Sequence, residues 1–217
     1  MVSRLSPLQQ EILEAFFRRA KGFFLTGGAA LAGYHLGHRT TADLDLFTTT
    51  EPLDVGDEAL GAAAIDTGAT VESLQTAPDF RRRLVRRSGE GVVVDLVRDR
   101  GPCSALSKRD IAGVRVDPPE EILANKICTL LSRAELRDLV DVLCLERAGF
   151  RVEDALGLAG LKDAGLTPAQ LAWVLSQIAI GDDASIPADL TVGELRSFLS
   201  DLIARLSRLA FPTQQQR

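Results

Sequence analysis

The spacing of apolar residues changes near Pro118-Pro119, and this change separates the chain into two parts. Beyond the prolines, apolar residues recur every three or four positions, which is the period of an amphipathic helix. Before them, short apolar runs alternate with glycine-rich turns and helical segments. We therefore predict an α/β part over residues 1–117 and a helical part over residues 118–217, with helices at 120–131, 134–147, 152–158, 167–178 and 192–209.

The first part carries the signals of a mixed sheet flanked by helices. Ser6-Pro7 precedes apolar residues at helical spacing, so a capped helix is expected over residues 7–20. Ser88-Gly89-Glu90-Gly91 is typical of a hairpin turn. The fold expected is α+β, with an N-terminal mixed β-sheet, flanking helices and a C-terminal helical region. Strands are expected at 22–26, 43–49, 70–75, 82–87, 91–98 and 113–116, and further helices at 29–36 and 57–65.

Asp43 and Asp45 stand two positions apart inside an apolar run, and they are the first indication of chemistry. Alternate strand side chains share a face, so the two carboxylates project together while Leu44 projects to the other side. Carboxylates this close repel each other unless a cation lies between them, and hard oxygen ligands favour Mg²⁺ over zinc. The alternative is a solvated pair on an exposed edge strand.

Two further features point to the same chemistry. Thr26-Gly27-Gly28 joins an expected strand to an expected helix, where backbone amides and the helix N-terminus can bind a phosphate; the alternative is a tight turn that binds nothing. Asp95 interrupts an expected strand after three valines and would supply a third carboxylate to a two-metal site. The alternative interpretation is that Asp95 lies at the end of the strand and pairs with Arg98 or Arg100.

Composition and charge limit the class of protein. The net charge of −5 and the pI of about 5.2 exclude a basic module that coats nucleic acid. One basic cluster at 80–87 would either attract RNA or a triphosphate, or form a solvated edge strand. The three cysteines lack metal-site spacing, which favours a reduced, cytoplasmic setting. Cys128 and Cys144 lie within apolar helical patterns, so we expect them in the core. No apolar run is long enough to suggest a signal peptide or a membrane span.

Gly27-Gly28 followed by HRTTADLDLF at 38–47 resembles the polymerase-beta-type nucleotidyltransferases, and more narrowly the AbiEii/AbiGii toxin family. The resemblance reaches to about residue 147. One departure is Thr41, where the family has serine; threonine keeps the hydroxyl. A second family signature on consecutive helices is matched by Lys126, Arg133, Arg137, Asp138 and Asp141.

The resemblance implies transfer of a nucleotide from an NTP with Mg²⁺ as cofactor. Thr26, Gly27 and Gly28 would bind the nucleotide's phosphates, and Asp43, Asp45 and Asp95 would bind the metal. Asp95 would also place the acceptor hydroxyl. Lys126 would contact a phosphate, and Asp138 would be an active-site residue of the helical part. Arg39 belongs to the expected nucleotide-binding set, where we expect it to order the acidic strand by pairing with a carboxylate.

Several functions stay open at this point. The leading hypothesis is the toxin of a toxin–antitoxin or phage-defence pair, with an RNA such as tRNA or a protein as acceptor and a cognate antitoxin as partner. The alternatives are an inactive nucleotidyltransferase-fold binding module and an enzyme that modifies a small molecule such as an antibiotic. Asp138 and Asp141 share a helix face by their spacing, and without the resemblance they would be read as a salt-bridged helix surface.

Overall fold

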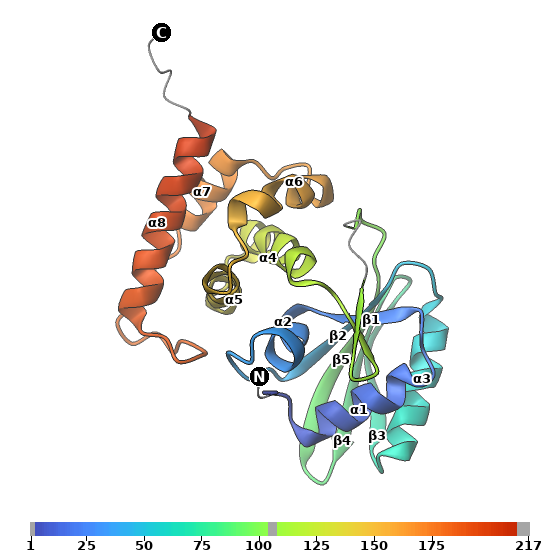
Figure 1. Ribbon diagram of the computed structural model, residues 1–217. Coiled ribbons are helices and arrows are strands. Elements are labelled where there is room, and N and C mark those ends of the chain that lie inside the picture. The colour runs from blue at the N-terminus through green and yellow to red at the C-terminus, as the bar shows by residue number, and fades with distance from the viewer. Residues whose placement is uncertain (1–2, 104–107, 212–217) are drawn as a thin grey trace. The chain divides into compact units, whose positions relative to one another are not determined.

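The computed structural model describes residues 3–103 and 108–211, and the chain divides into two compact units (Figure 1). The first unit extends to Gly101 and includes the segment that ends at Pro118. The second begins at Pro119 and takes in the short stretch around Cys103. The assignment of residues 1–117 and 118–217 to separate domains stays a prediction.

In its described residues, the first unit is a mixed seven-stranded sheet with helices, as the sequence predicted. The strand order is β3-β4-β5-β2-β1-β7-β6. The strands are β1 (Phe23–Thr26), β2 (Asp43–Thr48), β3 (Thr70–Ala77), β4 (Phe80–Arg87), β5 (Glu90–Arg98), β6 (Arg109–Ile111) and β7 (Val114–Val116). The helices are α1 (Pro7–Phe17), α2 (Gly27–Ala30), continued by the π-helical turn η1 (Leu31–His35), and α3 (Leu53–Asp66).

One face of the sheet forms the core of this unit. Leu44 and Leu46 of β2 and Leu96 of β5 are completely buried on it. Helix α1 packs on this face, where the rings of Phe16 and Phe23 meet edge to face at 5.5 Å. Helix α3 lies close enough that a side chain at its Gly56 would collide with Phe23. Because β2 alternates buried and half-buried residues, its aspartates belong to the opposite face.

The described residues of the second unit form helices, as predicted from the apolar spacing. The buried stripe of α8, which consists of Leu195, Leu199, Leu202 and Leu206, shows the period of an amphipathic helix. Thr191 caps α8 in a reciprocal capping box with Glu194. The helices are α4 (Pro119–Arg133), α5 (Leu136–Arg147), α6 (Val152–Lys162), α7 (Pro168–Ser176) and α8 (Val192–Ala210).

Some expected details were wrong. Strand β6 was not predicted, because three residues of mixed polarity give no periodic signal. Helix α3 begins four residues before its expected start at Asp57, directly after Pro52, whose ring suits a helix N-terminus. Cys128 and Cys144, expected in the core, are only half-buried. Among the described residues there is no disulfide, and no helix is long and apolar enough to cross a membrane.

Candidate active site

The central strands bring three carboxylates to one region of one sheet face. Asp43 and Asp45 both lie on the half-buried face of β2. The parallel strand β5 places Asp95 directly beside Asp45, at the same position along the sheet. Neighbouring strands are about 4.8 Å apart, so the three side chains emerge close together. The spacing within β2 was readable from the sequence, but the pairing of β2 with β5 was not.

The glycine turn lies against this acidic group. Thr26, the last residue of β1, pairs with Asp45 across the antiparallel ladder, and Gly27 follows it. Gly27 has a φ of +64°, and a Cβ atom there would collide with Oδ2 of Asp45. A side chain at this position would be strained by the backbone conformation, and it would also displace the carboxylate. The turn therefore brings a bare backbone into contact with one of the acidic residues.

The segment before β2 is tied to the same turn. Arg39 is buried, its Nη1 donates to the carbonyl of Thr40 at 3.0 Å, and its guanidinium packs against Gly28. The Thr41 hydroxyl donates to Oδ1 of Asp43 at 2.6 Å. The Gln9 side chain of α1 donates to the carbonyl of Thr41 at 3.0 Å and so anchors the segment. Threonine at position 41 thus retains a hydroxyl that orients the first acidic residue.

Asp95 is held by an arginine that the sequence analysis did not assign to it. Nε and Nη2 of Arg82 donate to the two carboxylate oxygens of Asp95 at 2.8 and 2.7 Å. The expected alternative partners, Arg98 and Arg100, were wrong: Arg100 pairs with Asp79, and Asp95 lies within β5 rather than at its end. The predicted hairpin turn carried the signal in its register, because pairing about Ser88-Gly89 places Arg82 opposite Asp95.

The charge of Arg82 also interacts with the charges of the two other carboxylates. Its pKa is raised above the usual arginine value, first by the hydrogen bond to Asp95 and by the charge of that residue. The charges of Asp43 and Asp45 raise it further. The guanidinium therefore pairs with Asp95 and lies near enough to Asp43 and Asp45 to be influenced by their charges.

The donor chemistry of this group suits a hard divalent cation. It offers carboxylate oxygens from adjacent positions of paired strands, which are the ligands that Mg²⁺ prefers. As the side chains stand, no set of three or more His, Cys, Asp or Glu residues in the described ranges is arranged to hold a metal ion. At this site both oxygens of Asp95 are engaged by Arg82.

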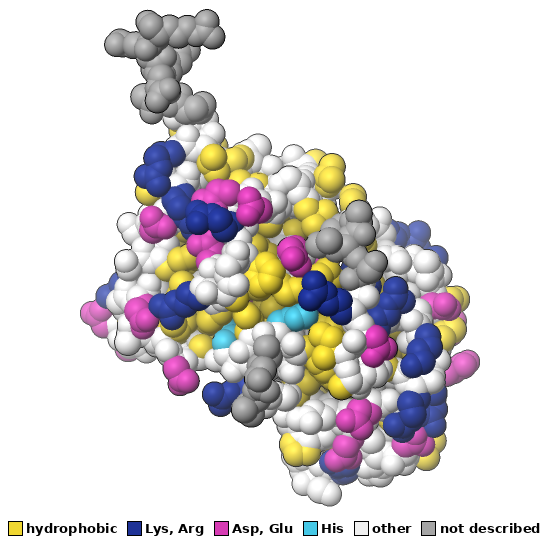
Figure 2. All heavy atoms as spheres, in the orientation of Figure 1, with side chains coloured by type: hydrophobic (Ala, Val, Ile, Leu, Met, Phe, Trp, Pro, Cys, Tyr) yellow, Lys and Arg dark blue, Asp and Glu magenta, His cyan; other side chains and the backbone are white. Residues whose placement is uncertain are grey.

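The remaining arginines of β4 serve mainly as internal partners. Arg83 binds Asp57 of α3 through two hydrogen bonds, at 2.9 and 2.7 Å, and Arg81 also pairs with that carboxylate. Arg87 pairs with Glu11 of α1. The expected edge strand was wrong, since β3 lies outside β4 in the sheet. Acidic and basic side chains are likewise interspersed on the face shown in Figure 2.

The second signature forms a buried ionic cluster inside the helical unit. Nζ of Lys126 on α4 lies 2.7 Å from both Asp138 Oδ1 and Asp141 Oδ2 on α5. Nε of Arg133 donates to the other oxygen of Asp138 at 2.9 Å. Both aspartates are completely buried, and Lys126 is nearly so. The expected contact of Lys126 with a phosphate and the active-site role of Asp138 stay predictions.

The pKa shifts in this cluster follow from its geometry. Burial opposes the charge of Lys126, but Asp141 and Asp138 more than offset it, and the pKa of Lys126 is raised above its usual 10.5. Burial likewise opposes the charge of Asp138, yet Lys126 and Arg133 hold its pKa below the usual 3.8. Both groups are therefore charged near neutral pH.

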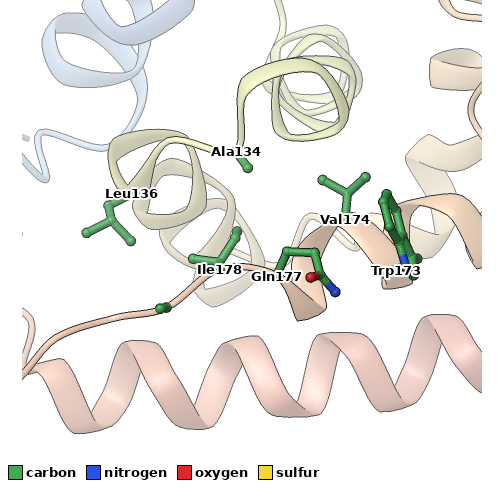
Figure 3. Close-up of a pocket in the computed structure, with 7 residues that line it drawn as sticks. Ala134, Leu136, Trp173, Val174, Gln177 and Ile178 are labelled. Carbon is green, nitrogen blue, oxygen red and sulfur yellow. The ribbon is translucent and has the colours of Figure 1, made fainter.

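A pocket in the helical unit contains no predicted site residue. Figure 3 shows its wall, which is formed largely by apolar side chains from α7, the segment after it, and the start of α5. The helical spacing of Trp173 in the sequence predicts a core position, but the side chain is 61% exposed, because its position on α7 lies off the buried stripe of Leu171 and Leu175. The lining residues are Ala134, Leu136, Trp173, Val174, Gln177, Ile178 and Ala179.

Two solved structures are similar to this chain. The crystal structure of JHP933 from Helicobacter pylori is similar to this chain with a TM-score of 0.61 and 20% identity, over 93% of this chain and 90% of that one. A second Helicobacter pylori structure, provisionally assigned as a nucleotidyltransferase, gives a TM-score of 0.46 and 14% identity, over 93% of this chain and 94% of that one. At these identities the likeness to JHP933 concerns the fold. No curated protein matches the sequence.

A family model decides the relationship. It matches residues 11–211 and describes a nucleotidyl transferase AbiEii toxin of a type IV toxin–antitoxin system. The match extends well past residue 147, where the resemblance noted in the sequence ended. It includes α4 to α8 in full. The chain therefore belongs to the AbiEii family of nucleotidyltransferase toxins.

Proposed function

We propose that this protein transfers a nucleotide from an NTP to a hydroxyl group of an RNA, such as a tRNA, or of a protein, and that it requires Mg²⁺. The supporting observation is the convergence of Asp43, Asp45 and Asp95 beside the glycine turn at Gly27. Family membership supplies the reaction class. The metal, the nucleotide and the acceptor are the added parts of the proposal.

The residues of the proposed site have separate roles in binding phosphate, binding metal and orienting these groups. The backbone at Gly27 and Gly28 binds the triphosphate, since these positions expose peptide groups without side chains. Asp43, Asp45 and Asp95 hold Mg²⁺, which when bound neutralises phosphate charge and favours ionisation of the attacking oxygen. Asp95 places the acceptor hydroxyl. Thr41 orients Asp43, and buried Arg39 fixes the segment that connects the turn to β2.

The transfer step is a displacement at phosphorus. The acceptor oxygen forms a bond to the α-phosphorus of the NTP, and the bond from that phosphorus to the bridging oxygen of pyrophosphate breaks. The hydroxyl proton passes to a carboxylate of the acidic group or to water, and pyrophosphate leaves with the bonding electron pair. The position of the acidic group beside the turn proposed to hold the phosphates supports this displacement.

The retention of all three carboxylates favours an enzyme over an inactive binding module. A module without catalysis would have no need to bring three aspartates together on one half-buried sheet face. Modification of a small molecule remains the second candidate for the acceptor. A cognate antitoxin is the partner we propose from the family.

The test is label transfer with matched variants. Purified protein is incubated with each of the four α-labelled NTPs, Mg²⁺, and total RNA, total protein or a set of aminoglycosides. We expect labelled RNA or protein, and a loss of about 100-fold or more for Asp43→Asn and Asp45→Asn, because several kcal/mol of transition-state stabilisation is removed. The control is Asp79→Asn, an aspartate of the same unit that pairs with Arg100 outside the acidic group.

The outcomes separate the candidates. Label on RNA or protein supports the proposal, and label on the aminoglycosides alone moves the acceptor to the small-molecule class. Absence of label with every NTP, together with a growth phenotype that Asp43→Asn and Asp45→Asn leave unchanged, would establish the inactive binding module instead.

A further inference from the structure

Arg82 on β4 contacts the acidic group directly, through Asp95. Its guanidinium binds both oxygens of Asp95 in a bidentate arrangement. Such planar pairs are among the strongest charge-assisted hydrogen bonds in proteins. The same two oxygens are the ones that Asp95 would offer to a metal ion. Arg82 and a divalent cation therefore compete for one carboxylate.

The two sides of this pair differ in their freedom to move. The Asp95 side chain is 9% exposed and sits on β5, in the middle of the sheet. The Arg82 side chain is 45% exposed and carries its charge on a long, flexible stem. The arginine can thus leave toward solvent without any change in the core, whereas the carboxylate cannot. Displacement of the pair means movement of Arg82.

A displaced Arg82 would remain next to the substrate phosphates. Its backbone is opposite Asp95 in the β4–β5 ladder, and Asp95 is beside Asp45, which contacts the Gly27 turn. Arginine suits phosphate oxygens because its donors match them two at a time. Binding of metal at the acidic group and of triphosphate at the turn would therefore offer the guanidinium a new anionic partner within reach.

We propose that Arg82 is an exchangeable counter-ion: it neutralises Asp95 in the resting protein, yields that carboxylate to the divalent cation, and then binds a phosphate oxygen of the incoming NTP. This inference rests on the proposed function. It makes two predictions of opposite sign for the loss of Arg82. Metal should bind more tightly in the absence of nucleotide, because a competitor is gone, and the nucleotide should bind more weakly.

The experiment uses Arg82→Gln, with Arg86→Gln as the matched control. Arg86 lies on the same strand and the same face, about 13 Å farther along, and it makes only a loose 3.9 Å ion pair with Glu72 at the exposed surface. Mn²⁺ binding is measured by electron paramagnetic resonance without nucleotide, and kcat and KM for the NTP are measured by label transfer. Arg82→Lys is a second variant, which keeps the charge but loses the bidentate geometry.

For Arg82→Gln we expect about tenfold tighter Mn²⁺ binding and about a tenfold higher KM for the NTP, with kcat changed less. Arg82→Lys should lie between Arg82→Gln and the wild type in both measurements, and Arg86→Gln should match the wild type. Folding is checked by circular dichroism. If Arg82→Gln does not fold, Arg82→Lys alone carries the test, since loss of the bidentate pairing should still tighten Mn²⁺ binding and raise KM.

Failure of this inference is distinguishable from failure of the proposed function. If the wild type binds Mn²⁺ and transfers label while Arg82→Gln matches Arg86→Gln in both measurements, the exchange is wrong and the nucleotidyltransferase proposal stands. Mn²⁺ binding that weakens in Arg82→Gln overturns the exchange as well, because Arg82 would then support the metal site. Absence of both Mn²⁺ binding and label transfer in the wild type overturns the two proposals together.

Discussion

Replacement of Lys126 by methionine should destabilise the helical unit strongly. Lys126 stands between two completely buried carboxylates, with its Nζ atom 2.7 Å from an oxygen of each. Methionine fills a similar volume but removes the charge. Arg133 still binds Asp138, but its side chain is 43% exposed and is an incomplete substitute. The variant therefore leaves two buried like charges near each other.

The size of the effect follows from this geometry. Removal of one partner from a buried ion pair costs about 3–5 kcal/mol, because the remaining charge has lost its hydration without compensation. For a chain of this length, a loss of that size lowers the melting temperature by roughly 6–20 °C. The upper part of the range applies if Asp138 and Asp141 stay ionised, and the lower part applies if one of them takes up a proton.

The assay is urea unfolding followed by two signals. Trp173 is the single tryptophan of the chain and lies on α7, so its fluorescence reports on the helical unit. Far-ultraviolet circular dichroism follows all helices. The control is Arg137→Met, which removes a half-exposed cation of α5 from its pair with Glu135 and should cost about 1 kcal/mol or less. A loss for Lys126→Met no larger than that of Arg137→Met would refute the reasoning.

Two further predictions concern other parts of the chain. Gly27→Ala should abolish label transfer, because its Cβ atom would displace the Asp45 carboxylate and because the backbone φ angle there is +64°. The control is Gly61→Ala on α3, whose Cβ atom would meet no atom within 4 Å and which should leave transfer intact. Equal activities of the two variants would contradict the close approach of the turn and the carboxylate. The pKa of Asp138 is lowered, so its stabilising effect is present above its usual 3.8 and is lost as the pH falls through the lower value of the folded protein. Urea midpoints measured from pH 6 to pH 3 should therefore fall more steeply for the wild type than for Asp138→Asn, and parallel curves would show that Asp138 does not contribute.

Local features of the fold were predictable because they depend on neighbours in the sequence. The Ser6-Pro7 start of α1, the alternation that puts Asp43 and Asp45 on one face, and the Ser88-Gly89 turn all obey short-range rules. Both turn residues have positive φ angles, as two-residue hairpins of this type require. The family signature followed from the same local segments.

The long-range pairings were not predictable from one sequence. Strands β2 and β5 are parallel neighbours although α3, β3 and β4 separate them along the chain. No local rule selects β5 over another strand for this place, so the position of Asp95 beside Asp45 required the structure. The ion pairs of Lys126 with Asp138 and Asp141 were not predicted, for a related reason. Spacing alone indicated that the two aspartates share one face of a helix, but it could not show whether that face is buried.

The parallel pairing of β2 with β5 has a consequence for the synthesis of this toxin. The acidic group forms through contacts between segments that are distant in sequence, and such contacts form slowly in folding. A nascent chain that ends anywhere before Asp95 lacks the third carboxylate, whatever local structure it has acquired. The proposed active site is thus complete only after the chain has been synthesised through β5.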